Sequence, residues 1–348
     1  MKKTDSKIVT AYIIFCTASL FSFQLNAQSN KQPPNYSLHS FGLKVSDVDR
    51  SVEFYQTLFD VPVLLREKST VYLGLGNGKE FVSLSPIGEG ESPHITHIGI
   101  AVKEFDVNSL EKKLTANGLK KSEGVGLDRS GLNAAMSYWA SGITNSKSAG
   151  KQVISLVDYE GVQFRLLPED YCVDQNKSPS NCELDNKSNE SAPMTLMGIN
   201  HFTTFVANFE RANTFYKKLL GIENHMFQGS FPTLGVGDGY QFLMFVGGVQ
   251  QGKPTAAASI HHVSLAVKEF DVDKIQSILN GKGLKRVDGG NGTVPALSHY
   301  VSLRMPERGG AEGGSPELYF TDPDGLRIQL QDASYCGGGG YLGNECKK

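Results

Sequence analysis

The chain has 348 residues and a formal net charge of −2, with 20% of its residues charged. A balance this mild gives no sign of nucleic acid or an anionic membrane surface as a partner. The length suits two domains of ordinary size.

The chain opens with the features of an export signal. Three lysines precede the apolar run IVTAYIIFCTASLFSF, which ends at Ala27 before a polar stretch. A basic region, a short apolar region and a small-residue cleavage site predict a signal peptide over residues 1–27. The apolar run is too short and wrongly flanked for a lasting membrane anchor, although an uncleaved anchor is the alternative. Removal of this segment, which carries three Lys and one Asp, would change the formal charge to −4.

The remainder of the chain contains two copies of one sequence repeat. THIGIAVKEFDV in the first half recurs as HHVSLAVKEFDV in the second, which matches His97 with His262. On either side, SFGLKVSDVDRSVEFY matches HFTTFVANFERANTFY, and DYEGVQFRL matches DPDGLRIQL. The offset stays between 161 and 165 residues, so the sequence predicts two copies of one domain, residues 36–170 and 196–334.

Each copy reads as two halves of the form strand, helix, strands. In the first copy Asp47 and Asp106 are placed to cap helices, and Gly118 to end one. In the second copy Asn208 and Asp271 take the cap positions. The helices of the second copy carry apolar stripes at helical spacing: Ala212, Phe215, Tyr216, Leu219 and Leu220 before Gly221, and Val272, Ile275, Ile278 and Leu279 before Gly283.

One pair of cysteines closes each copy, Cys172 with Cys182 and Cys336 with Cys346. Among the three possible connectivities, duplication favours these two local disulfides, which persist only in an oxidising compartment. A zinc site made from the four thiols is the alternative, but the Cys-x9-Cys spacing is wider than in zinc knuckles. The sequence thus predicts a linker with a local disulfide over residues 171–195, a disulfide-closed tail over 335–348, and a periplasmic or secreted protein.

The paired strand–helix–strand–strand–strand units resemble the vicinal oxygen chelate (VOC) superfamily. The resemblance rests on these units, on a His early in the opening strands, and on the closing DPDG-x-x-I-[EQ]-L pattern. That superfamily holds glyoxalases, bleomycin-sequestering and fosfomycin-resistance proteins, and extradiol ring-cleaving dioxygenases. The resemblance implies an α+β fold of two tandem glyoxalase-like domains. In each, two βαβββ units would form an open, barrel-like cleft that can hold a divalent metal.

Strand alternation indicates which side chains would face the cleft of the second copy. In HFTTFV, HHVSLAV, LRIQLQ and ELYFT, apolar residues occupy one face, which the helical stripes must cover. His201, His262, Gln329 and Tyr319 lie on the other face and are therefore expected to converge in the cleft. Two imidazoles and one oxygen ligand suit a facial metal site with open positions.

Gln329 departs from the pattern of the dioxygenases, which carry Glu at this position. A Gln carbonyl can coordinate a metal but brings no charge, and glyoxalase I sites use Gln at some ligand positions. Glu317 lies on the same face and is the alternative third ligand. The expected cofactor is a divalent metal, iron(II) or manganese(II), with zinc(II) or nickel(II) as alternatives. A vestigial pair of histidines lining a polar cleft is the metal-free interpretation.

The first copy is expected to lack the metal site. His201 corresponds to Ser40, since His39 is one residue out of register and is expected to face the opposite side. His97 matches His262, but Arg165 stands where the second copy has Gln329. Ser, His and Arg cannot chelate a divalent cation. Such a cleft could receive a carboxylate or could serve only to support the second copy. His94 and His225 are expected at the surface.

The sequence LYFTDPDGLRIQ is similar to the extradiol dioxygenase signature. The resemblance implies that Tyr319 orients the substrate, and His299 is the only nearby candidate for a catalytic base. Between them the inserted loop RMPERGGAEGG is either a lid that carries Arg304 and Arg308 toward an anionic substrate or a tolerated surface insertion.

We therefore expect an exported metal-dependent enzyme of dioxygenase type that acts on a small aromatic or phenolic molecule. The expected partner is this small-molecule substrate, with no nucleic acid and no membrane after signal cleavage. One alternative is a non-catalytic protein that sequesters a small molecule on the same scaffold. The other is an isomerase or lyase of glyoxalase type, which would use the metal as a Lewis acid. The sequence does not choose the substrate, the metal or the oligomeric state.

Overall fold

The computed structural model describes residues 35–76, 79–123, 131–142, 152–173, 192–237, 239–289, 293–343 and 345–346. The predicted signal peptide and most of the predicted linker, with Cys182, lie outside the described residues. No helix in the described part of the chain is long and apolar enough to cross a bilayer.

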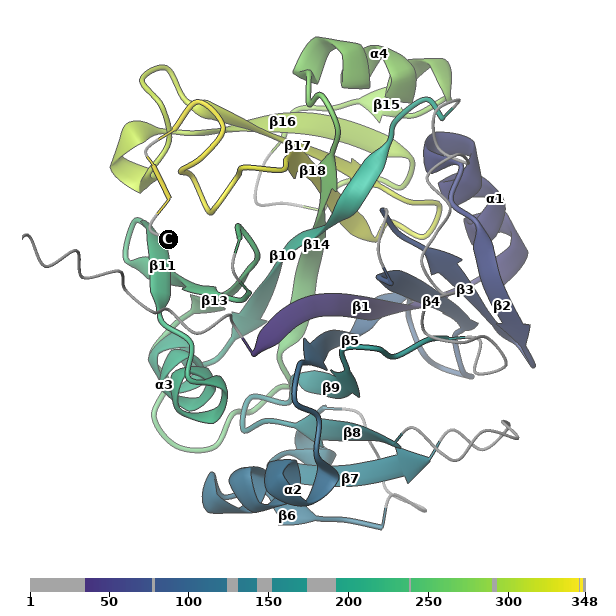
Figure 1. Ribbon diagram of the computed structural model, residues 1–348. Coiled ribbons are helices and arrows are strands. Elements are labelled where there is room, and N and C mark those ends of the chain that lie inside the picture. Colours follow the sequence, from purple (N-terminus) through teal and green to yellow (C-terminus); the bar gives the residue numbers. More distant parts are fainter. Residues whose placement is uncertain are drawn as a thin grey trace, which may run out of the picture. The chain divides into compact units, whose positions relative to one another are not determined.

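The first repeat forms one mixed sheet with the strand order β2-β3-β4-β1-β5-β9-β8-β7-β6 (Figure 1). Its helices are α1 (Val48–Phe59), α2 (Val107–Ala116) and the short 3-10 helix η1 (Gly131–Ala134). Its strands are β1 (Tyr36–Val45), β2 (Val63–Glu67), β3 (Thr70–Gly74), β4 (Phe81–Pro86), β5 (His94–Val102), β6 (Lys120–Lys121), β7 (Ser137–Gly142), β8 (Gln152–Val157) and β9 (Gln163–Pro168).

The second repeat forms a sheet of the same order, β11-β12-β13-β10-β14-β18-β17-β16-β15. Its helices are α3 (Phe209–Leu220), α4 (Val272–Gly281) and the 3-10 helix η4 (Pro306–Arg308). Its strands are β10 (Leu196–Val206), β11 (Asn224–Gln228), β12 (Phe231–Gly235), β13 (Phe242–Gly247), β14 (Ser259–Val267), β15 (Lys285–Arg286), β16 (Ser298–Arg304), β17 (Ser315–Thr321) and β18 (Arg327–Asp332).

The two halves of each repeat join along their opening strands. β1 and β5 are antiparallel, while β1 is parallel to β4 and β5 is parallel to β9. The second repeat pairs β10, β14, β13 and β18 in the same way. Each half is therefore a βαβββ unit, extended in the second half by a two-residue strand. The predicted α+β fold of two glyoxalase-like repeats is confirmed.

The helices begin where the sequence predicts. The side chains of Asp47, Asp106, Asn208 and Asp271 each accept a hydrogen bond from a backbone N–H in the first turn of their helix. α3 ends at Gly221, whose φ of 69° is the left-handed conformation that favours glycine. The caps thus fix where each helix starts, and the apolar stripe of each helix faces the sheets.

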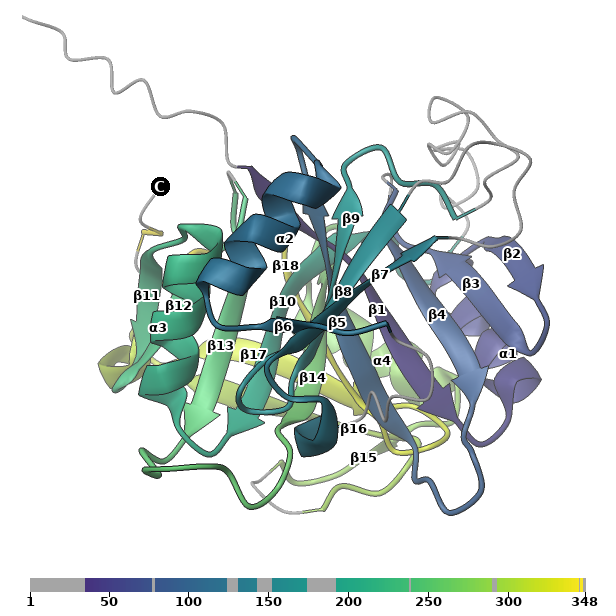
Figure 2. The ribbon, with the colours of Figure 1, turned by 90° about the horizontal axis from the view of Figure 1, so that it is seen from below.

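A single hydrophobic core contains side chains from both repeats. Phe54 and Phe59 of α1 contact Phe320 of β17 in the other repeat, with ring centroids 6.0 and 6.1 Å apart. In the same way, the ring centroid of Tyr216 of α3 lies 4.7 Å from that of Phe164 of β9 in the first repeat. Figure 2 shows β2–β4 with α1 on one side of this unit and β11–β13 with α3 on the other.

Two sets of hydrogen bonds, here called clasps, join a helix of one repeat to the turn before β9 or β18 of the other. Tyr216 donates to Asp158 at 2.7 Å, and Arg211 to Glu160 at 2.7 Å. The same contacts recur with the repeats exchanged: Tyr55 donates to Asp322 at 3.2 Å, and Arg50 to Asp324 at 2.8 Å. The second oxygen of Asp158 and of Asp322 accepts two backbone N–H groups of its own turn. The D-x-[DE]-G motif therefore builds the junction between the repeats.

A third contact between the repeats joins the turns before β4 and β13. Gln241 accepts from the Leu38 N–H at 2.8 Å, and the carboxyl of Glu80, its counterpart, accepts from the Ile199 N–H. Gln241 also approaches Glu80 at 3.4 Å. Burial raises the pKa of Glu80 to about 8, because the ionised form would leave water.

The tail after β18 is closed by a disulfide between Cys336 and Cys346, as predicted. Cys172 is also disulfide-bonded, although its predicted partner lies outside the described residues. These three disulfide-bonded cysteines exclude a zinc site made from all four thiols. His225 was expected at the surface, but the structure buries it beside Cys336 and Cys346, with its ring nitrogen within 4.8 Å of their sulfur atoms. His94 is exposed, as predicted.

Candidate functional site

Four adjacent strands of the second repeat bring the predicted site residues together. His201 lies on β10, His262 on β14, Gln329 on β18 and Tyr319 on β17. Gln329 pairs with Ser264 across one strand border and with Tyr319 across the other, so all three side chains share one face of the sheet. His201, His262, Gln329 and Tyr319 all line a cavity of about 520 Å³.

The Nε2 atoms of the two histidines face each other in the wall of this cavity. Their Nε2 atoms lie 3.3 Å apart, and both side chains are buried. Two nitrogens about 2.1 Å from one ion lie about 3 Å apart when their bonds are at right angles, so this spacing fits a shared metal ion. Burial, aided by Arg304, lowers the pKa of His201 to about 3. Burial also lowers the pKa of His262 well below its ordinary value. Both rings are therefore neutral, as metal ligands must be.

The hydrogen bonds of His201 set its tautomer for metal binding. Asn200 donates through Nδ2 to the carbonyl of Tyr335 at 2.9 Å, so its Oδ1 must accept from the Nδ1 of His201 at 2.7 Å. The His201 proton therefore lies on Nδ1, and Nε2 presents its lone pair to the cavity. Phe242 stacks on the ring at a centroid distance of 4.2 Å and fixes its orientation.

His262 is held in the opposite tautomer by a chain of contacts. Arg327 can only donate, so the Nε2 of His261 accepts from it and the His261 proton lies on Nδ1. That proton is donated to the Nδ1 of His262 at 2.8 Å, which leaves the His262 proton on Nε2, facing His201. A metal ion needs this Nε2 lone pair. Either the His261–His262 or the His261–Arg327 contact must therefore open before His262 can bind an ion.

Gln329 offers the third ligand position. Its Oε1 and Nε2 are both buried and make no hydrogen bond of ordinary geometry to a described residue, although the amide lies close enough to the His201 ring to act against the lowering of its pKa. Buried polar atoms are almost always paired in folded proteins, so an unpaired amide between two histidines marks a place where a further group belongs. The residues present therefore fit a divalent ion held by His201, His262 and Gln329, with Gln329 as a neutral oxygen ligand.

Glu317, the alternative third ligand, is already engaged in a polar network. Arg304 binds both of its carboxylate oxygens, at 2.9 and 2.8 Å. Tyr319 donates to it at 3.1 Å, and the hydroxyl of Tyr335 donates to the other oxygen. Burial and the Glu317 charge raise the pKa of Tyr319 well above its ordinary value, so Tyr319 remains a neutral phenol. Ligation by Glu317 would require it to leave these donors.

The structure does not bring His299 into this site. On β16 it pairs with Phe320, on the apolar face of the sheet, and its Nε2 lies 2.9 Å from Asn280 of α4. The neighbouring Tyr300 faces the cavity instead and stacks on Tyr319 at 5.0 Å. His299 is therefore part of the packing between α4 and the sheet, and alternation along β16 is the physical reason.

The sequence patterns missed His261, and a β-bulge explains why. Thr203 pairs with His262 and Thr204 with Ile260, so His261 is the extra residue and turns toward the cavity beside His262. Tyr335 was missed because it follows the last strand. The only signal for it was that a Tyr precedes the first Cys of both tails.

A bulge also moves His39 in the first repeat. Leu38 pairs with Ile100 and Ser40 with Gly99, which leaves His39 unpaired in the strand. Its ring contacts Phe81 and Tyr171, the counterparts of the two rings that flank His201. The expectation that His39 faces the apolar side was wrong, because alternation fails across a bulge.

Solved dioxygenase structures share this fold. A variant of homoprotocatechuate 2,3-dioxygenase from B. fuscum matches with a TM-score of 0.58 at 17% identity, over 88% of this chain and 74% of the other. The 2,3-dioxygenase LapB from Pseudomonas sp. KL28 matches with a TM-score of 0.58 at 16% identity, over 87% of this chain and 92% of its own. A catechol 2,3-dioxygenase matches with a TM-score of 0.55 at 16% identity, over 91% and 96%.

At these identities the matches show the fold, which is the vicinal oxygen chelate fold that the sequence predicted. No protein-family model and no curated protein matches the chain.

Proposed function

We propose that the second repeat is a metal-dependent active site of extradiol-dioxygenase type that acts on a small aromatic or phenolic molecule. The observation that carries this proposal is the pair of neutral histidines whose Nε2 atoms lie 3.3 Å apart beside the unpaired amide of Gln329. His201, His262 and Gln329 would hold iron(II) or manganese(II). Such an ion would supply Lewis acidity and, with dioxygen, redox chemistry.

The walls of the cavity suit a phenolic substrate. The Tyr319 hydroxyl donates to Glu317, which leaves its oxygen lone pairs to accept a hydrogen bond from a substrate hydroxyl. Phe205, Met244 and Val246 supply apolar surface for a ring. Arg308 and Arg327 also line the cavity and favour a substrate with negative charge.

Metal binding by matched histidine variants tests the proposed ligands. We expect about one iron(II) or manganese(II) per chain, lost in His262→Ala and kept in His97→Ala, its counterpart in the first repeat. Metal content is read by elemental analysis of protein prepared without added zinc or nickel. Equal loss from both variants would place the site elsewhere.

Oxygen uptake with a panel of catechols tests the reaction. The proposal expects uptake that depends on the bound ion and vanishes in His262→Ala. Turnover of a substrate without oxygen uptake would instead indicate an isomerase or lyase. Binding of a phenolic ligand by the metal-free protein, with no turnover, would indicate a sequestering protein. Gln329 is the observation that supports a sequestering protein, since its neutral amide would bring no charge to a metal ion.

We also propose that the protein is exported to the periplasm or secreted. The predicted signal peptide and the oxidised Cys172 and Cys336 support this location, because disulfides persist in oxidising compartments. The mature chain should begin near Gln28 when its N-terminus is sequenced. Peptide mapping without reductant should link Cys172 to Cys182. A mature chain that starts at Met1, or free thiols in the native protein, would contradict export.

A further inference from the structure

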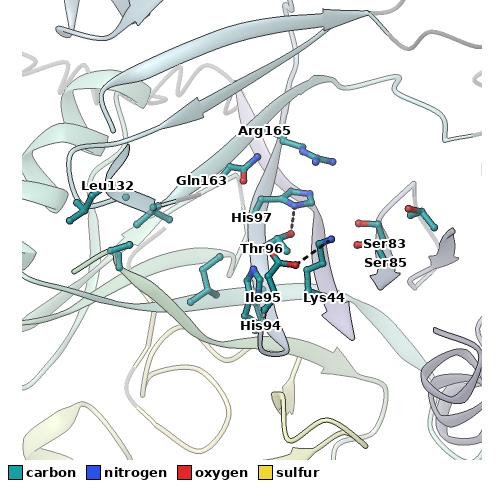
Figure 3. Close-up of a pocket in the computed structure, with 18 of the residues that line it drawn as sticks. Lys44, Ser83, Ser85, His94, Ile95, Thr96, His97, Leu132, Gln163 and Arg165 are labelled. Carbon is teal, nitrogen blue, oxygen red and sulfur yellow. Dashed lines mark hydrogen bonds and ion pairs between the residues drawn. The ribbon is translucent and has the colours of Figure 1, made fainter. Parts of the chain in front are cut away.

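The first repeat holds a cavity of its own, larger than that of the candidate metal site. It measures about 830 Å³ and opens on the cleft face of β1, β3, β4, β5 and β9 (Figure 3). Ala257, Ala258 and Ile260 of the second repeat also line it, so both repeats build it. The cavity is thus a built feature of the folded chain, distinct from the one that contains His201 and His262.

A buried imidazole without a partner lies in its wall. The Nδ1 of His97 is 2.7 Å from the hydroxyl of Thr96, whereas its Nε2 makes no hydrogen bond to any described residue. The side chain of His97 is only 2% exposed, so water does not satisfy Nε2 freely. When the Thr96 hydroxyl donates to Nδ1, Nε2 carries the proton and is a buried donor in the cavity wall, with no acceptor among the described residues. A ligand with an acceptor atom would complete this arrangement.

The charge around His97 is that of an anion site. Arg165, on β9 beside Gly99, occupies the position at which the second repeat has Gln329. Its guanidinium is permanently charged, and it lowers the pKa of His97 further than burial alone, so His97 is neutral. Lys44 adds a second cation; it donates to the Pro86 carbonyl at 2.8 Å and lies 3.7 Å from Glu91, which also lines the cavity. Figure 3 shows His97, Arg165 and Lys44 directed into the same space.

The remaining walls accept a hydrocarbon body. Ile95, Val162, Leu132 and Ile260 present apolar surface, and Tyr72 adds an aromatic ring. Ser83 and Ser85 add hydroxyls on the β4 side. Arginine can bind a carboxylate through two parallel hydrogen bonds, and the apolar walls suit a ligand that is not a bare inorganic ion. We propose that the cleft of the first repeat binds a small organic carboxylate, with its charge on Arg165 and the Nε2 of His97.

Benzoate is a suitable probe, and calorimetric titration of the mature full-length protein is the measurement. We expect one benzoate bound in this cleft, and at least tenfold weaker binding in Arg165→Gln, which installs the residue of the second repeat. Benzoate in the second cavity would form a separate binding step, which Arg165→Gln should leave unchanged. Arg308→Gln is the matched control because it removes a cation from the other cavity, and it should leave this binding unchanged. Benzyl alcohol, which has the same ring without the charge, should bind at least tenfold more weakly than benzoate.

Ser85→Glu is a second variant that leaves the buried groups intact. Its carboxylate would lie in the same cavity and should weaken benzoate binding severalfold through repulsion, even where Arg165→Gln fails to fold. The proposal fails if neither variant weakens binding, or if only Arg308→Gln does. It also fails if benzyl alcohol binds as tightly as benzoate. Inorganic phosphate that binds as tightly as benzoate would show that the cleft recognises charge alone, and would overturn the assignment to organic carboxylates.

Discussion

At the residue scale, the two repeats differ by an exchange on their closing strands. β9 carries Gln163 and Arg165, while β18 carries Arg327 and Gln329, the same two side chains in the opposite order. Gln329 thereby stands beside two histidines, whereas Arg165 stands beside one. A fixed guanidinium repels a metal ion, so this exchange, together with Ser40 in place of His201, separates a candidate cation site from a candidate anion site.

Gln329→Glu should tighten metal binding in the second repeat. The substitution barely changes the side-chain volume and restores an anionic ligand beside two neutral imidazoles. We expect the affinity for iron(II) or manganese(II) to rise at least tenfold, about 1.4 kcal/mol. Direct titration of the metal-free protein measures this change. If the wild type already binds tightly and the variant is no better, Gln329 is not a ligand and Glu317 becomes the residue to test.

At the scale of elements, strand alternation and helix capping predicted most of the site. His201, His262, Gln329 and Tyr319 converge because the pairing of β10 with β14 is regular from His201 to Thr203 and from His262 to Ser264, and the pairing of β17 with β18 is regular as well. The failures occur at irregularities. A bulge of one residue reverses the face of His39 and adds His261 to the cavity, and no local sequence signal marks either bulge. His299 was placed by proximity in sequence to Tyr319, although alternation along β16 puts it on the other face.

The bulge in β14 gives Arg327 a role in metal loading, through its contact with His261. Arg327→Gln should raise metal affinity severalfold, since a Gln amide can accept a proton from His261 where Arg cannot, and this frees the His262 tautomer. Loss of a positive charge would contribute as well, and Arg308→Gln controls for that because it lines the same cavity without touching His261. Metal titration of both variants distinguishes the two effects. An equal rise in metal affinity in both would show that charge alone is responsible and would contradict the tautomer argument.

At the scale of the whole molecule, partly buried and buried carboxyls join the repeats. Burial raises the pKa of Glu80 to about 8, that of Asp158 to about 7 and that of Asp322 to about 6. In the unfolded chain each would ionise near pH 4. Between that pH and its folded pKa, each of these carboxyls holds a proton in the folded protein that it loses in the unfolded chain, so its contribution to stability falls as the pH rises.

The melting temperature should therefore decrease from about pH 7 to pH 8, and Glu80→Gln should flatten part of this decrease. At lower pH the buried histidines, whose pKa values are lowered, oppose this trend, because the unfolded chain binds the protons that they exclude. One carboxyl contributes at most about 1.4 kcal/mol per pH unit within its window. Gln241 already occupies the equivalent place in the other repeat, which makes glutamine the matched replacement. Thermal unfolding across this pH range, with the exposed Glu53→Gln as control, measures the effect. A variant that keeps the full slope would show that Glu80 is ionised in the folded protein.

The two crossed clasps have a consequence for how the chain arose. Tyr55 and Arg50 contact Asp322 and Asp324, while Tyr216 and Arg211 contact Asp158 and Glu160. One patch thus meets a second copy of itself, which is the mark of an isologous dimer interface. A single ancestral repeat carrying both the helix and the turn could have formed this interface between two identical chains. Identical chains must carry identical clefts. Two repeats in one chain are free of that constraint, and here one cleft carries paired histidines where the other carries a guanidinium.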